Sequence, residues 1–519
     1  MNFDPANESP DERLEVLPSN LCCRRIQAGA VAWHEIARRL RAEQALLLAL
    51  WGADDRDRDG RYRVYAAFLG RNEILVLAHA MDATAHPTYP SLAEFFPAAV
   101  RMERAVFDLV GLRSTHPDHR GWLRHSGWPE DWFPLRRDSD AAAQFPVAPE
   151  PYAFVQVEGD GVHEIPVGPV HAGIIEPGNF RFSIVGEKVL RLEERLGYKH
   201  KGIEKRFEAL AVREGHRLAA RLSGDSAVAF SWAWCAALEA ATGAVIPPRA
   251  AHLRALALEH ERIANHLGDL GALGNDAGFA FGLTHFSRCK EDLLRLNRSV
   301  FGARYLMDFV APGGVARDLP PQALQQLFDF YATLEKNVAE LRAIYENHAG
   351  VQDRFRTTGT LATATAQSLG AVGLAARASG IRQDLRVTHP WPPYSEIEID
   401  AVVEDAGDVA ARADLRFEEI FASLRFCRAL LAQLAAGATQ AEVPDAEPGL
   451  LALGVIEGWR GPVLIALETA PHGGIRRCHA HDPSWQNWPL LEHAILGNIV
   501  PDFPLINKSF NLSYSGQDG

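Results

Sequence analysis

The 519-residue sequence contains six cysteines but no Cys-x-x-Cys pair. Structural zinc sites and iron–sulfur clusters are usually built from such closely spaced thiolates, so neither is expected within this chain. The cysteines, which include the adjacent Cys22 and Cys23, also lack the spacing of a disulfide framework. Their pattern favours a reduced, cytosolic setting.

Long apolar runs and an excess of positive charge are also missing. No stretch approaches the roughly 18–20 uninterrupted apolar residues that a membrane-spanning helix needs. The polar, acidic segment from Met1 to Asn20 does not have the pattern of a secretory signal. A net charge of −13 argues against broad nucleic-acid binding, which depends on a basic surface. With 47% hydrophobic and 23% charged residues, the sequence predicts a globular protein of two or three domains.

Residues 30–138 are predicted to form a small α/β domain, preceded by an N-terminal tail over 1–29. Apolar residues recur at helical spacing over Ala30–Glu43, and Gly111 is placed to end a second helix over Phe96–Leu112. Between these helices lie three short apolar runs that are typical of strands: Ala45–Trp51, Tyr62–Leu69 and Glu73–Ala78. From residue types alone, the charged side chains of this part are interpreted as solvated or fold-stabilising pairs.

Several ordered motifs of this domain resemble the C-type subunit of respiratory complex I. The motifs are Glu103 with Asp108 and Gly111, then His116-Pro117, then Pro134-Leu135-Arg136-Arg137-Asp138. In that family the domain has no cofactor and serves as a docking scaffold. The resemblance therefore implies a docking role for residues 30–138.

The rest of the sequence is predicted to form one large domain over 151–519, joined by a linker over 139–150 that is rich in Ala, Pro and Asp. Its first segment is predicted to contain strands at Tyr152–Val157 and Val162–Val170. Long helical patterns follow: Ala227–Ala241, Arg249–Gly271, Phe286–Phe309, Pro321–His348 and Val409–Leu434. The predicted fold class is therefore α+β, a small α/β domain followed by a mainly helical bundle that opens with a β-containing segment.

Motifs along the large domain resemble the D-type subunit of complex I and the large subunit of group 4, membrane-bound hydrogenases. They are Gly168–His171, Glu176–Arg181, Tyr198–Lys205, Glu261–Leu267, Pro312–Val315, Ala378–Asp384, Thr388–Pro390 and Trp488-Pro489. Together with the C-type domain, the order of parts is similar to the fused large subunit of formate hydrogenlyase-type complexes.

Two further segments resemble the metal-binding motifs of nickel–iron hydrogenases, but without the thiols. Residues 221–226 correspond to Arg-x-Cys-Gly-x-Cys, and residues 505–516 correspond to a closing motif that ends in Cys-x-x-Cys. The resemblance places these residues at the four ligand positions: Ser223, Ser226, Ser513 and Gly516. Nickel and low-spin iron need soft thiolate ligands. We therefore expect no nickel–iron centre, and no metal or other cofactor in this chain.

The residues that contact quinone in complex I are missing as well, because the family's histidine and tyrosine positions fall near Pro177 and at Gly224. The resemblance implies that iron–sulfur clusters belong to a partner, a small subunit of the hydrogenase and complex I type. It also implies membrane partners of the complex I and antiporter type. The expected location is the cytoplasmic side of the cell membrane, where the chain would be peripheral.

Three residues remain as candidates for proton transfer or ligand binding. Glu176 stands at the family's proton-transferring glutamate, which would need a dry pocket; alternatively, it caps a nearby helix N-terminus. Asp225 could give oxygen ligands to a hard cation, or could be the N-cap of the helix from Ala227. His472 replaces the arginine of the family's Ala-Pro-Arg-Gly. It would titrate near neutral pH if it faced the same cavity, and would otherwise be a satisfied histidine without a role.

We expect Glu176, the Ser223–Ser226 turn and the Ser513–Gly516 tail to converge, because the family's four ligand positions bind one metal cluster. Without a metal, hydrogen bonds among hydroxyls, Asp225 and backbone groups must hold these segments in contact, since unpaired buried polar atoms destabilise the fold.

Two functions from different classes are compatible with these residues. In the first, the chain is a peripheral-arm subunit of an oxidoreductase complex that couples electron transfer to proton or ion translocation. In the second, it is a non-catalytic scaffold that joins an iron–sulfur subunit to antiporter-like membrane subunits. Hydrogenase activity of the chain itself is not expected in either case.

Overall fold

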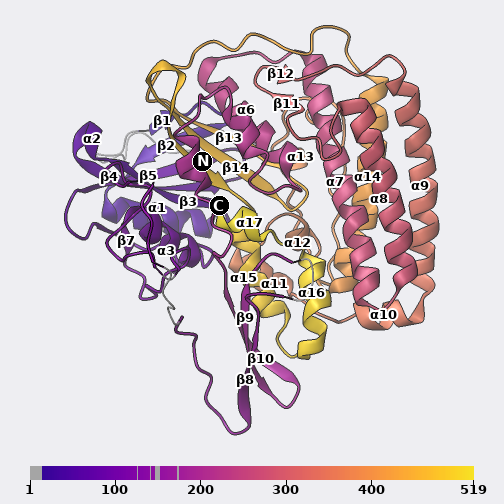
Figure 1. Ribbon diagram of the computed structural model, residues 1–519, viewed down its shortest axis with the longest axis horizontal. Helices are drawn as coiled ribbons and strands as arrows, with labels where there is room; N and C mark the ends of the chain where they lie inside the picture. The colour runs from indigo at the N-terminus through magenta and orange to yellow at the C-terminus, as the bar shows by residue number, and fades with distance from the viewer. Residues whose placement is uncertain (1–13, 126, 141, 147–151, 172–174) are drawn as a thin grey trace.

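The computed structural model describes residues 14–519 except 126, 141, 147–151 and 172–174 (Figure 1). A sheet-based N-terminal part lies on one side, and a group of long helices lies on the other (Figure 1). This arrangement confirms the predicted α+β class. Most of the predicted linker over 139–150 is described, but residues 141 and 147–150 lie outside the described set.

The N-terminal part is built on a five-stranded sheet with the order β1-β2-β5-β4-β3. Its strands are β1 (Leu14–Val16), β2 (Cys23–Gln27), β3 (Leu46–Asp55), β4 (Arg61–Leu69) and β5 (Ile74–Asp82). All neighbours are antiparallel except β2 and β5, which pair in parallel. The three predicted strands are therefore confirmed. Because β1 and β2 belong to the sheet, the prediction of a tail over 1–29 is wrong for residues 14–27.

Two helices accompany this sheet, α1 (Ala30–Ala42) and α3 (Ala99–Val110). Gly111 follows α3 with φ of 81°, a left-handed conformation that glycine adopts without strain, so the predicted helix end is confirmed. The remaining elements of this part are short: α2 (Arg56–Asp59), β6 (Thr88–Tyr89) and β7 (Arg113–Ser114).

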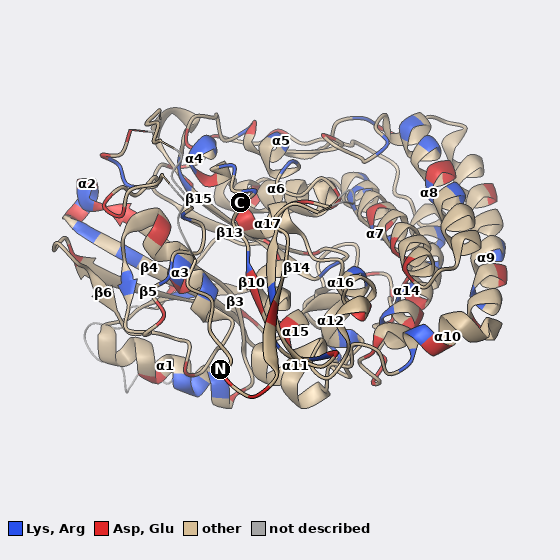
Figure 2. Ribbon diagram, turned by 60° about the horizontal axis from the view of Figure 1, so that its bottom comes forward, with Lys and Arg blue, Asp and Glu red and all other residues tan. Residues whose placement is uncertain are grey.

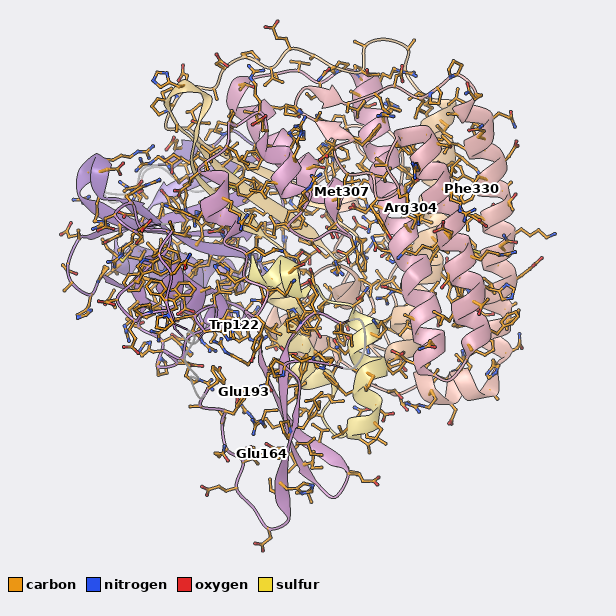
Figure 3. All side chains as sticks on the ribbon, in the orientation of Figure 1. Trp122, Glu164, Glu193, Arg304, Met307 and Phe330 are labelled. Carbon is orange, nitrogen blue, oxygen red and sulfur yellow. The ribbon has the colours of Figure 1, made fainter. Side chains whose placement is uncertain are left out.

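The large part opens with an antiparallel sheet that projects from the body of the molecule (Figure 1). Its strands are β8 (Val162–Val167), β9 (Asn179–Val185) and β10 (Lys188–Arg195). The strand predicted over Tyr152–Val157 is absent from the described residues of that segment. There the amide of Val155 donates to the Glu193 carboxylate at 2.7 Å, so a side chain takes the place of a partner strand. Trp122 and Glu193 mark the place where the N-terminal part meets this sheet (Figure 3).

Four long helices lie side by side as the bundle: α7 (Pro248–Asp276), α8 (Ala280–Phe301), α9 (Ala323–Asn347) and α14 (Val409–Ala432) (Figure 1). A fifth long helix, α6 (Ala227–Thr242), lies between this bundle and a second sheet. These confirm the predicted helices, although α8 ends earlier than expected because Gly302 takes a φ of 88°. The helix α7 is buried along most of its length and still carries acidic and basic residues (Figure 2). Within the described residues, every helix is too short or too polar to cross a membrane.

A second antiparallel sheet packs against α6 and was not predicted from the sequence. It consists of β13 (Leu451–Glu457), β14 (Pro462–Thr469) and β15 (Ile475–His481). Every residue of β13 and β14 is buried, so their apolar runs show no alternation that would mark a strand. A side chain at Gly454 would have its Cβ 1.8 Å from the carbonyl oxygen of Ala233, so glycine permits the close approach of sheet and helix.

Short elements connect and close this part. They are α4 (Ile203–Phe207), α5 (Gly215–Ala219), β11 (Val310–Ala311), β12 (Gly314–Val315), α10 (Ala349–Phe355), α11 (Thr363–Leu369), α12 (Gly373–Arg377), α13 (Leu385–Thr388), α15 (Ser484–Ala494), α16 (Phe503–Phe510) and α17 (Tyr514–Asp518). Two 3-10 turns lie at Pro471–Gly473 and Val500–Asp502. The C-terminal α17 lies in the middle of the molecule (Figure 1), so the end of the chain reaches the start of α6.

Candidate functional site

The two segments that carry the expected ligand positions meet in the structure. The Ser223 Oγ and Ser513 Oγ atoms lie 2.9 Å apart across a sequence separation of 290 residues. Both residues are buried, with 2% and 5% of their surface exposed. The predicted convergence of the Ser223–Ser226 turn and the C-terminal tail is therefore found.

An ion pair holds the turn before α6. Asp225 Oδ1 accepts a hydrogen bond from Ser223 Oγ at 2.6 Å. The Arg460 guanidinium, from the β13–β14 loop, donates to both carboxylate oxygens of Asp225 at 2.9 and 2.6 Å. Burial acts to raise the pKa of Asp225, but the adjacent Arg460 outweighs it and the pKa is lowered. Asp225 is therefore a carboxylate whose charge Arg460 already neutralises.

Asp225 is not the N-cap of α6, which corrects that alternative. The cap position is Ser226, and its side chain makes no capping hydrogen bond. The free amides of the first turn, on Val228 and Ala229, instead donate to the Glu261 carboxylate of α7 at 2.6 and 3.1 Å. Burial raises the pKa of Glu261 to about 8. Glu261, from a different helix, therefore accepts the first-turn hydrogen bonds that an N-cap at Asp225 was expected to accept.

The tail side of the site is closed by a buried carboxyl. Ser513 Oγ accepts from the Gly516 amide at 2.9 Å, and the Ser513 amide donates to Ser484 Oγ at 2.9 Å. Asp482 Oδ1 accepts from the Ser484 amide at 2.8 Å. A Cβ atom at Gly516 would lie 2.4 Å from Asp482 Oδ2, so this carboxyl fills the space of a side chain at position 516. Burial raises the pKa of Asp482.

Glu176 reaches the same tail, as predicted, but from a wetter position than proton transfer was expected to need. Its Oε2 atom accepts from the Ser515 amide at 3.0 Å, and Lys199 Nζ lies 4.0 Å from its Oε1 atom. The carboxylate is 40% exposed. Its contact with the first turn of α17 agrees with the alternative, a carboxylate that caps a nearby helix N-terminus.

His472 does not face this site, so that prediction is wrong. It is exposed in the 3-10 turn after β14, with φ of 60°. Arg460 precedes β14, a strand of 8 residues, and at about 3.3 Å per residue the two ends of such a strand lie roughly 25 Å apart. Among the described residues no hydrogen bond or ion pair joins His472 to the serine site, by which we mean Ser223, Asp225, Arg460, Asp482, Ser513 and Gly516.

The donor set does not fit a nickel–iron centre. Serine hydroxyls and backbone amides stand where soft thiolates would be needed, and Gly516 offers no side chain. The hard-cation interpretation of Asp225 also finds no support, because its carboxylate already binds Arg460. In the part of the chain that the structure describes, no group of three His, Cys, Asp or Glu residues is arranged to hold a metal ion.

Sequence reasoning missed Arg460 and Asp482, and it noted Glu261 only as part of the motif Glu261–Leu267, without a role at this site. Arg460 follows a buried strand, Asp482 follows another, and Glu261 lies in the middle of α7. None stands in a motif with the two serine segments. Met307 lies next to Gly224 in the turn before α6 (Figure 3). A Cβ atom added at Gly224 would be 3.7 Å from the Met307 Cε atom.

Comparison with known proteins identifies both parts of the chain. A family model described as the respiratory-chain NADH dehydrogenase 30 Kd subunit matches residues 26–145, and one described as the 49 Kd subunit matches residues 276–452. The fold and these matches define a two-part protein in which a domain of the first type precedes one of the second.

The chain matches relatives over most of their length. The chain is 32% identical over 481 residues to formate hydrogenlyase subunit 5 of Escherichia coli (strain K12), covering 91% of this chain and 84% of that protein. It is 29% identical to the NADH-quinone oxidoreductase C/D fusion protein of Phocaeicola vulgatus, covering 74% and 78%. The chain belongs to the family of fused C/D-type complex I subunits. Its fold also resembles a chain of the archaeal membrane-bound sulfane sulfur reductase, with a TM-score of 0.65, 23% identity, and coverage of 69% and 99%.

Proposed function

We propose that this chain is a peripheral-arm subunit of a membrane-associated oxidoreductase complex of the complex I and group 4 hydrogenase type. In this role it takes part in coupling electron transfer to proton or ion translocation, without a nickel–iron centre. The names of its relatives, a formate hydrogenlyase subunit and subunits of NADH-quinone oxidoreductases, support the class of complex.

The observation that carries the proposal is the closed state of the serine site. Ser223 and Ser513 share a hydrogen bond, Arg460 neutralises Asp225, and Asp482 occupies the space beside Gly516. Hydroxyls stay protonated near neutral pH and are poor ligands for nickel. The family frame is therefore kept, while the groups inside it favour proton and charge chemistry over metal binding.

The proposal includes partners. A small iron–sulfur subunit would deliver electrons, and membrane subunits of the antiporter type would carry the translocated ion. The chain would then lie on the cytoplasmic side of the membrane, held there by the complex. The family membership supports a role within a larger complex, because the relatives are by name subunits of formate hydrogenlyase and of NADH-quinone oxidoreductase.

The experiment is purification of the chain from membranes through an N-terminal affinity tag, because the C-terminal residues are buried, followed by elemental analysis and partner identification. We expect iron, an iron–sulfur subunit and membrane subunits to copurify, with nickel well below one atom per chain. A nickel-containing enzyme expressed in the same medium is the positive control. Stoichiometric nickel, or hydrogen uptake with a dye acceptor, would overturn the proposal.

The scaffold alternative is tested in the same preparation. The pair Ser223→Ala and Ser513→Ala removes both hydroxyls and keeps the backbone. Loss of electron transfer in a fully assembled complex supports a role for the site, whereas unchanged electron transfer favours the scaffold.

A further inference from the structure

A second group of charged side chains lies inside the large part, and none of them belongs to the serine site. Four are carboxylates and three are guanidiniums, each with 3% or less of its side chain exposed: Glu259, Asp384, Glu419, Glu457, Arg262, Arg377 and Arg386. They come from α7, the α12–α13 segment, α14 and the end of β13. We call these seven residues the buried charge cluster.

Ion pairs connect the cluster. Arg386 donates to Asp384 at 2.6 and 3.0 Å and to Glu259 at 3.0 and 3.1 Å. Arg377 donates to Glu419 at 2.6 and 2.9 Å. Arg262 lies 3.4 Å from Glu259 and 3.5 Å from Glu419. The four carboxylates therefore form ion pairs with only these three guanidinium groups of the cluster.

The cluster has one negative charge too many for its surroundings. Arginine stays protonated in proteins, so the guanidiniums supply three positive charges against four carboxylates. An uncompensated charge that is buried away from water is strongly unfavourable, and such groups bind or release a proton instead. The cluster is therefore expected to hold one proton.

His266 is a poor place for this proton. Its Nε2 atom lies 2.8 Å from Glu419, but its buried Nδ1 atom has no partner within the described residues. A protonated ring would carry an unsatisfied N–H at Nδ1. Burial lowers the pKa of His266, in agreement with a neutral ring.

Among the carboxylates, Glu457 has the weakest set of donors. From the described residues it receives only the long hydrogen bonds from Arg377 Nη1 at 3.2 Å and from the Leu385 amide at 3.3 Å. Glu259, by contrast, also accepts from Tyr394 at 2.7 Å and from Ser423 at 2.6 Å. The charged groups that act directly on Glu457 are Asp384, Arg262, Arg377 and Arg386. These in turn pair with Glu259 and Glu419, and His266 contacts Glu419.

We propose that Glu457 is the proton-binding residue of the buried charge cluster and that its proton is linked electrostatically to the charge of the serine site. The inference deepens the proposed function, on which its role in coupling rests. In support, burial raises the pKa of Glu457 to about 7, close to the working range of a cell.

The link runs through Glu457, the last residue of β13, and the three residues that follow it. Arg262 donates to the backbone carbonyls of Glu457 and Gly458 at 3.0 and 3.3 Å. Next along the chain, Trp459 Nε1 donates to the Asp225 carbonyl at 2.9 Å, and Arg460 pairs with the Asp225 carboxylate. A negative charge added near Asp225 strengthens proton binding at Glu457, and a proton on Glu457 stabilises that charge, because the coupling is reciprocal.

The proton makes a pH-dependent contribution to stability. The pKa of Glu457 is raised in the folded protein, so its contribution is fully present below about pH 4.5 and is lost as the pH rises through about 7. Glu457→Gln keeps the neutral form and removes this dependence. Relative to wild type, its folding equilibrium constant should rise on the order of 100-fold between pH 5 and pH 8.

The test is denaturant unfolding of the full chain at pH 5 and pH 8 for wild type, Glu457→Gln and Glu398→Gln. Glu398 is exposed, so its variant should follow wild type at both pH values. Burial also raises the pKa of Glu103 and Asp518 to about 7, so infrared titration of the wild type should show one additional carboxylic-acid band that is lost near pH 7 and is absent from Glu457→Gln. This measurement is made on the folded state, so it keeps the test valid if the variant is less stable than wild type.

Equal behaviour of Glu457→Gln and wild type with pH, or infrared spectra of the two that lose the same carboxylic-acid bands near pH 7, would overturn the inference. Both measurements use the isolated chain, so they can fail while the complex still contains its expected partners. If the proton is found but Glu457→Gln leaves the pH profile of electron transfer in the assembled complex unchanged, the link to the serine site is wrong.

Discussion

The serine site and the buried charge cluster lie beside each other, yet they balance charge in different ways. At the serine site, the Asp225 carboxylate is 38% exposed and pairs with Arg460, while burial raises the pKa of Asp482 and neutral hydroxyls complete the network. In the buried charge cluster, four carboxylates share three guanidiniums at 3% exposure or less. Where water reaches a carboxylate, a single ion pair is enough to balance its charge. Where water is excluded, the shortage of one cation has to be met by a proton.

The largest effect is expected from Arg377→Met, which removes the guanidinium between Glu419 and Glu457. Breaking a buried ion pair from one side leaves a carboxylate without its partner, at a cost of about 3–5 kcal/mol in the free energy of unfolding. Denaturant titration measures this loss. The loss should be smaller at pH 5 than at pH 8, because the freed carboxylates can then take up protons.

A matched control is Arg382→Met, from the same loop region. Arg382 is exposed and forms no ion pair with a described residue. Its replacement should change stability by less than about 0.5 kcal/mol. Equal losses for the two variants would show that the buried charge cluster does not stabilise the fold as described.

Arg460→Met is expected to cost less, about 1–2 kcal/mol, although Arg460 makes a two-pronged contact with Asp225. The reason is that the Asp225 carboxylate is 38% exposed and can be solvated once its partner is gone. The same unfolding measurement tests this value. A loss as large as that of Arg377→Met would mean that the serine site is as dry as the cluster.

A double-mutant cycle tests how Asp482 fills the place beside Gly516. Gly516→Ala should cost about 1–3 kcal/mol, because the new Cβ would lie 2.4 Å from Asp482 Oδ2. In the background of Asp482→Ala the same change should cost less, so the two changes should show coupling of about 1 kcal/mol. If the costs simply add, the carboxyl does not occupy this space, and cysteines at the four positions could rebuild a metal site without changing Asp482.

The sequence predicts the features that depend on neighbouring residues, and it predicts less of those that depend on contacts between distant residues. The end of α3 at Gly111 and the start of α6 after Ser226 follow from local rules, and both are found. The contact of Ser223 with Ser513 was predictable only through the family resemblance, since nothing local joins residues 290 positions apart.

Other parts could not be predicted because tertiary contacts decide them. The strands β13 and β14 are buried on both faces, so they lack the alternation that reveals a strand. Arg460 and Asp482 gain their importance from the sheet that brings strand ends to the tail. For His472 the opposite holds: its position in a motif placed it near the site, but it follows β14, whose length separates it from Arg460 and the site.

The smallest effect on stability is expected from Glu176→Gln. The carboxylate is 40% exposed and accepts one hydrogen bond from the Ser515 amide, which the carbonyl oxygen of glutamine can also accept. The free energy of unfolding should therefore change by no more than about 0.5 kcal/mol. Activity separates the two roles of this residue. If Glu176 transfers protons to the serine site, proton-coupled turnover of the assembled complex should fall about 100-fold or more, because glutamine cannot carry a proton.

The matched control for this change is Glu187→Gln, an exposed glutamate at the turn between β9 and β10. It should leave both stability and turnover unchanged. If Glu176→Gln also leaves turnover unchanged, Glu176 only caps α17. Protons would then have to reach Glu457 by a route that does not include Glu176, and the result would favour the scaffold alternative. A fall in turnover with assembly intact would instead place a proton carrier at the wetter serine site and a proton store in the dry cluster.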